Sequence, residues 1–81
     1  ISQMRRAAVS VVSNIVEGCA RSSEADYLHF LTIAFGSIRE LHYQAGLAKR
    51  LGYLSPPDSS LLEAKVIETE KVINALINSL R

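Results

Sequence analysis

Residues 23–52, SEADYLHFLTIAFGSIRELHYQAGLAKRLG, carry the longest regular pattern in this chain of 81 residues. Apolar side chains recur there at alternating steps of four and three residues: Tyr27, Leu31, Ala34, Ile38, Leu41, Ala45 and Ala48. This spacing puts them on one face of a helix and is typical of the packed seam of a helical bundle. Ser23 is the expected N-cap, and Gly52 suits a left-handed C-terminal cap. We therefore predict a helix over about 23–51.

A shorter helix is predicted before it, over about 2–19. Five residues form its expected apolar stripe: Met4, Ala8, Val11, Ile15 and Cys19. Cys19 is interpreted as a small core side chain on this stripe, and residues 18–22 as the break that ends the helix.

A third helix is predicted over about 56–81, with Ser55 as N-cap and Pro56 as its first residue. The four-and-three pattern continues through Leu62, Val66, Thr69, Ile73, Leu76 and Leu80. Polar residues fill most of the remaining surface and predict a solvated face: Glu63, Lys65, Glu68, Glu70 and Lys71. The sequence thus predicts one all-α domain over 1–81, an up-and-down antiparallel bundle with three helices.

Composition excludes several classes of protein. The net charge of +1 argues against a strongly basic nucleic-acid arm or an acidic tail, and a single cysteine cannot form an internal disulfide. The apolar runs are too short for a transmembrane helix, so we expect a cytoplasmic protein without a membrane partner. Position 1 is not methionine, which is compatible with a trimmed chain.

The predicted helices carry more apolar surface than three helices can bury together. Val9, Val12 and Val16 lie off the main stripe of the first helix, and the long helix has a second apolar surface that includes Phe30 and Leu47. This excess predicts a further helix, an oligomer, or both. A self-sufficient bundle of three helices is the alternative.

Three stretches carry a resemblance to a known family: MRRAAVSVVSNIVEG at 4–18 followed by Arg21, FLTIAFGSIREL at 30–41, and LGYL at 51–54. Together they resemble the four-helix bundle proteins of the 23S rRNA intervening-sequence family. That family is similar to the accessory variability protein of diversity-generating retroelements. This sequence departs from the family pattern at Val12, where proline is common, and at Phe35, where a smaller or basic residue is frequent.

The resemblance implies a bundle with one more helix before Arg5, assembled into a ring that is commonly a pentamer. It implies little chemistry, because most members have no established activity. The retroelement relatives bind nucleic acid and a reverse transcriptase through a basic surface. For this chain the resemblance therefore favours a homo-oligomer of unknown role, with an RNA- or DNA-binding accessory protein as the alternative.

No catalytic constellation is evident in the sequence. His29 and His42 are too far apart on one helix to share a metal ion, and no glycine-rich phosphate loop is present. Ser10 and Ser37 have no predicted base beside them; Ser37, next to Gly36, is expected to allow close helix packing while its hydroxyl bonds its own helix. We predict no enzyme, catalytic residue, cofactor, metal or small-molecule substrate.

Two polar groups of residues are the candidate functional positions. Arg6, Asn14, Glu17 and Glu40 are predicted to form a structural polar network between the first two helices. Arg5, Arg6 and Arg21 are the predicted nucleic-acid contacts, because residues 1–21 hold three arginines and one glutamate. The expected partners are other copies of this chain and, as the alternative, RNA or DNA.

Overall fold

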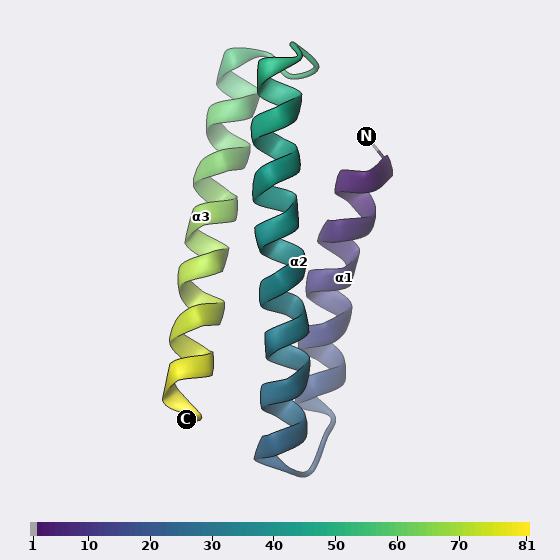
Figure 1. Cartoon of the computed structure of the whole chain (residues 1–81), viewed down its shortest axis with the longest axis vertical. Coiled ribbons are helices and arrows are strands. Elements are labelled where there is room, and N and C mark those ends of the chain that lie inside the picture. Colours follow the sequence, from purple (N-terminus) through teal and green to yellow (C-terminus); the bar gives the residue numbers. More distant parts are fainter. Residues whose placement is uncertain (1) are drawn as a thin grey trace.

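The structure is a computed structural model that describes residues 2–81 as three helices joined by two short loops. Helix α1 spans Ser2–Cys19, α2 spans Glu24–Arg50 and α3 spans Pro56–Ser79. Successive helices run antiparallel (Figure 1), and the described residues contain no strand. The predicted all-α, up-and-down architecture is confirmed, with each helix end within about two residues of its expected position.

Local sequence signals set the helix ends as predicted. The hydroxyl oxygens of Ser23 and Ser55 accept hydrogen bonds from the backbone N–H groups of Asp26 and Asp58, at 3.1 and 3.4 Å. Gly52 has a φ of 77°, a left-handed conformation that lets the next N–H, of Tyr53, bond the carbonyl of Ala48 at 2.9 Å. These contacts satisfy backbone groups that the ends of helices otherwise leave without partners.

The three helices form a single layer with α2 in the middle (Figure 1). Helices α1 and α3 each pack along α2, and within residues 2–81 their backbones do not contact each other. The molecule measures 43 × 22 × 14 Å, so its thinnest dimension is close to the diameter of one helix with side chains. Both broad faces of α2 are therefore only partly covered by its neighbours.

The core follows the central helix. The predicted stripe of α2 is confirmed, with Leu31, Ala34, Ile38, Leu41, Ala45 and Ala48 buried and Tyr27 half-buried. On α3 the buried contacts come from Val66, Ile73 and Ile77, together with Ser59 near the helix start. Leu76, predicted on the buried stripe, remains 37% exposed.

The buried line of α1 differs from its predicted stripe. Ala7, Val11 and Gly18 are buried, whereas Ala8 and Cys19 are exposed, so the interpretation of Cys19 as a core residue was wrong. The reason is the close approach at Gly18, where an added Cβ would lie 2.9 Å from the Tyr27 ring. This approach turns the line of Ala7, Val11 and Gly18 toward α2 and leaves Val9, Val12 and Val16 outside.

Two expectations about single residues have clear outcomes. Ser37 contacts α1 closely as predicted, but Gly36 takes no part in that contact, because it is exposed and nothing lies within 4 Å of the Cβ it lacks. The Ser37 hydroxyl bonds Ser10 of α1 at 2.8 Å instead of its own helix. Phe35, the second departure from the family pattern, is half-buried and packs against the core.

Candidate functional site

The main candidate site is an apolar groove between α1 and α3, above the central helix. Ile38 and Leu41 of α2 form its floor, Val12 lies on one side and Leu62 on the other. The groove encloses about 220 Å³, and almost all of its surface is apolar. A lining of this composition, open along its length, suits an apolar helix better than a polar substrate. We call this feature the front groove.

The rims of the front groove expose large aliphatic side chains. Val12 and Val16 of α1 are 62% and 63% exposed, and on the α3 side Leu61 and Val72 are 60% and 55% exposed. Single exposed apolar residues are ordinary, but Val12 lines the groove directly and the other three lie on the two helices that form its sides. The apolar excess predicted from the sequence is therefore present in the folded subunit.

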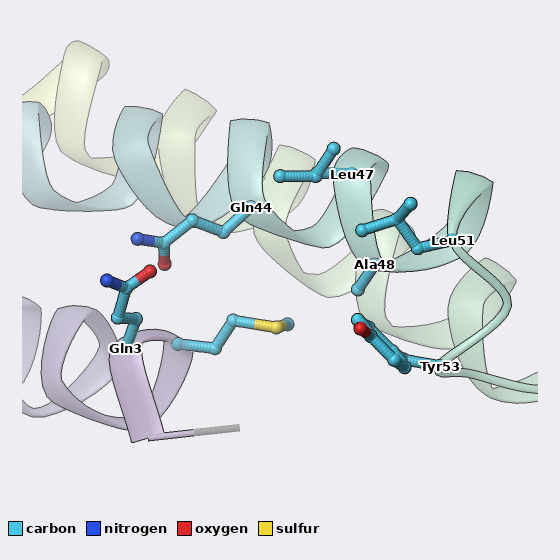
Figure 2. Close-up of a pocket in the computed structure, with 7 residues that line it drawn as sticks. Gln3, Gln44, Leu47, Ala48, Leu51 and Tyr53 are labelled. Atoms are coloured by element: carbon cyan, nitrogen blue, oxygen red, sulfur yellow. The ribbon is translucent and has the colours of Figure 1, made fainter.

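A second apolar depression lies between the start of α1 and the end of α2 (Figure 2). Leu47, Ala48 and Leu51 form one side, the Tyr53 ring lies below them, and the side-chain amides of Gln3 and Gln44 face each other at one end. The depression holds about 150 Å³. It adds to the apolar surface at the end of α2 that the described part of α1 leaves uncovered.

The three predicted nucleic-acid arginines do not meet in the subunit. Arg5 and Arg6 are exposed near the start of α1, whereas Arg21 follows its other end, about 22 Å away along the helix axis. Arg21 forms an ion pair with Glu17 at 3.0 Å and lies over the Phe30 ring, 4.9 Å from its centroid. Nucleic-acid contact by these residues stays a prediction.

Three of the four residues of the predicted polar network have separate partners. The Asn14 amide donates to the Ser10 carbonyl at 2.8 Å, Glu17 pairs with Arg21, and Glu40 accepts a hydrogen bond from Gln44 at 3.3 Å. Arg6 and Glu40 do line the same polar cleft, of about 340 Å³. Within the described residues these four side chains are not joined into one network, because partners one helical turn away engage Asn14, Glu17 and Glu40.

The interface between α2 and α3 contains two residues, Glu63 and Glu70, that were wrongly predicted to lie on a solvated face. Glu70 is 12% exposed; its Oε2 accepts a hydrogen bond from Arg39 Nη1 at 3.0 Å, and its Oε1 lies against His42 Nδ1. That second contact is attractive only when His42 carries a proton on Nδ1. Glu63 pairs with Lys49 at 3.4 Å.

A signal for these pairs was present in the sequence. His42 and Lys49 are one heptad apart on α2, and so are Glu70 and Glu63 on α3. In an antiparallel hairpin, a residue seven positions later on one helix lies beside a residue seven positions earlier on the other, so a pair between His42 and Glu70 implies one between Lys49 and Glu63. The matching spacing of opposite charges thus indicated a charged flank beside the apolar seam.

The residues considered for catalysis are not arranged for it. Ser10 and Ser37 bond each other, and residues 2–81 contain no group of three His, Cys, Asp or Glu side chains that could hold a metal ion. At the end of α1, burial raises the pKa of Tyr27, and the neighbouring Cys19 raises it further. Within the same range, no helix is both long and apolar enough to cross a membrane.

Comparison with known proteins identifies the family. A solved structure from Bacteroides thetaiotaomicron, a protein of unknown function of the S23 ribosomal protein family, is 26% identical and superimposes with a TM-score of 0.90. The match covers 94% of this chain and 70% of that one. No curated protein matches the sequence. The family described as 23S rRNA-intervening sequence protein matches residues 1–75, and the chain therefore belongs to this family, as the resemblance had indicated.

Proposed function

We propose that this protein is a non-catalytic helical module whose function depends on self-association into a ring, with a pentamer as the expected form. The observation that carries the proposal is the front groove, an apolar depression above Ile38 and Leu41 that stays open because the backbones of α1 and α3 do not meet. The groove is expected to receive apolar side chains from a second copy of this chain.

The size of the apolar rims supports a stable contact. Complete burial of a valine or leucine side chain contributes about 1.5–3 kcal/mol. Four rim residues are more than half exposed in the subunit: Val12, Val16, Leu61 and Val72. Their burial against another copy supplies about 4–7 kcal/mol, a large part of the roughly 8 kcal/mol that micromolar association requires.

The distribution of apolar residues favours a ring over a symmetric dimer. Leu47 is nine residues from Ile38, which places it half a turn around α2, on the face opposite the front groove. Leu47 and Leu51 are 37% and 58% exposed there. A subunit with different apolar faces on its two sides suits head-to-tail contacts, and these close into rings.

A non-catalytic role is part of the proposal. It is supported by the hydroxyls of Ser10 and Ser37, which bond each other, and by the ionic contacts of Glu63 and Glu70, which hold α3 to α2. We propose the cytoplasm as the location, since the exposed thiol of Cys19 suits a reducing compartment.

Sedimentation velocity at 10–100 µM tests the assembly. The parent chain is expected to sediment as an oligomer, and Val12→Glu is expected to shift it toward the monomer because the new charge would be buried in the contact. Ile67→Glu is the control: Ile67 of α3 is 40% exposed and belongs neither to the groove lining nor to the rim residues. A monomeric parent at 100 µM, or equal effects of both substitutions with helical content retained, would contradict the proposal.

A further inference from the structure

A polar groove lies between α2 and α3, along the edge where these two helices form their ion pairs. Arg39, His42, Tyr43 and Arg50 line it from α2, and Glu63 lines it from α3. It holds about 410 Å³ and is open to solvent rather than enclosed. The open form suits a ligand that lies along the surface, not a small molecule that is enveloped. We call this feature the arginine groove.

The charges of the arginine groove leave a cationic excess. Glu70 is held by Arg39 and His42, and Glu63 by Lys49, so both carboxylates already have partners. Within residues 2–81, Arg50 has no carboxylate at ion-pair distance, and Arg39 keeps 61% of its side chain exposed. The groove lining thus holds two permanent cations, Arg39 and Arg50, and one carboxylate, and the guanidinium of Arg50 is available to an added anion.

An exposed aromatic ring and a gap lie between the two arginines. Tyr43 is 66% exposed, so its ring is open to a stacking partner. Beside it, Gly46 contributes no side chain, and the nearest atom to its missing Cβ is Arg50 Nη1 at 3.7 Å. The spacing from Arg39 through Tyr43 and Gly46 to Arg50 keeps all four on one helix face, over about 16 Å.

We propose that the arginine groove binds single-stranded nucleic acid, with phosphates at Arg39 and Arg50 and a base stacked on Tyr43 above the gap at Gly46. Single-stranded nucleic acids are bound by cationic tracks that carry exposed aromatic rings, because every base offers a face for stacking. In a duplex the base faces are stacked on each other and cannot reach Tyr43. An acidic peptide could pair with the arginines but has no base to stack on the Tyr43 ring. This site is separate from Arg5, Arg6 and Arg21, and it does not depend on the front groove.

Fluorescence anisotropy with a labelled 12-residue oligouridine or oligothymidine, at low and moderate salt, tests the site. We expect Arg50→Gln to weaken binding several-fold and to reduce the salt dependence by about one phosphate contact. Tyr43→Leu is expected to weaken binding about fivefold or more, and Tyr43→Phe to retain it, because phenylalanine preserves the stacking surface. Lys71→Gln, which removes an exposed cation of α3 outside the groove, is the charge-matched control.

A second pair of variants keeps the test independent of folding. Gly46→Gln fills the gap, whereas Gly36→Gln adds the same side chain at an open position of the same helix outside the groove. Both changes favour the helix, so only the first is expected to weaken binding. The proposal is overturned if the parent does not bind at low salt, if Arg50→Gln and Tyr43→Leu bind like the parent, or if duplex or polyglutamate competes as well as the single strand.

Discussion

The central helix is held by two interfaces of different chemistry. Against α1 it packs closely through small residues, with Gly18 against Tyr27 and a hydroxyl pair between Ser10 and Ser37. Against α3 it packs through larger aliphatic residues, and carboxylates of α3 pair with cations of α2 along one edge. The first interface is neutral and depends on shape, whereas the second combines apolar burial with charge.

Together, these two interfaces keep a thin layer of three helices in register. Close packing of small residues tolerates no added volume, because neighbouring backbones already limit the space. A flank of ion pairs at heptad spacing penalises a slip of one helix along the other, although each exposed pair adds little stability. The two interfaces should therefore respond differently to added volume, lost volume, salt and pH.

The largest effect is expected from lost volume at the α2–α3 interface. Ile73 is 1% exposed, and Ile73→Ala removes three buried carbon atoms and leaves a cavity. Such changes lower the free energy of unfolding by about 2–5 kcal/mol, a large part of the stability of a domain of this size. Urea unfolding followed by circular dichroism measures it. The matched change Ile67→Ala, at a side chain 40% exposed, should cost much less, and an equal loss would contradict the assignment of the core.

The second-largest loss of stability is expected from added volume at the α1–α2 interface. In Gly18→Ala the new Cβ would lie 2.9 Å from the Tyr27 ring and 3.1 Å from Phe30 Cβ, and the second atom cannot move without its backbone. We expect a loss of about 1–3 kcal/mol by overpacking. Gly36→Ala is the control, because that position is open and alanine favours the helix by up to about 1 kcal/mol. The same sign of change at both glycines would contradict the close approach.

Salt should act mainly on the α2–α3 interface. Glu70→Gln keeps the shape of the side chain but removes the charge that Arg39 and His42 share. We expect a loss of about 1–2 kcal/mol, reduced from the value for a fully buried pair because Arg39 is mostly exposed. The loss should shrink at high salt. Glu17→Gln, which breaks the exposed pair with Arg21, should change the unfolding midpoint only slightly; a comparable loss there would remove the distinction between the interfaces.

The sequence predicted the parts of the fold that repeat or that use local chemistry. The stripe of α2 and the caps at Ser23, Ser55 and Gly52 were predicted because each depends on neighbours within one or two helical turns. The rotation of α1 was not predicted. It depends on the contact of Gly18 with Tyr27, which lies beyond the turn between the helices and has no periodic signature.

The candidate sites show the same division. The apolar excess at the front groove was predicted from helical periodicity alone. Val12 and Val16 fall outside the main apolar stripe of α1 regardless of which helix packs against that stripe. The arginine groove was missed, since Glu63 and Glu70 look like ordinary solvated residues of α3 until α2 is placed beside them. Pairings between helices became visible only with the antiparallel register.

The smallest expected effect is a response of the neutral α1–α2 interface to alkaline pH. Burial, and after it the neighbouring Cys19, raises the pKa of Tyr27 in the folded chain above its ordinary value of 10.0. The unfolded chain then loses this proton first, so the contribution is complete below about pH 10 and is lost as the pH rises through the folded pKa. The urea midpoint of the parent should therefore fall between pH 8 and 10.5 slightly more than that of Tyr27→Phe. Tyr43→Phe, at an exposed tyrosine of the same helix, controls for tyrosine ionisation in general, and an equal fall in the parent and Tyr27→Phe would show that the end of α1 does not bury the ring.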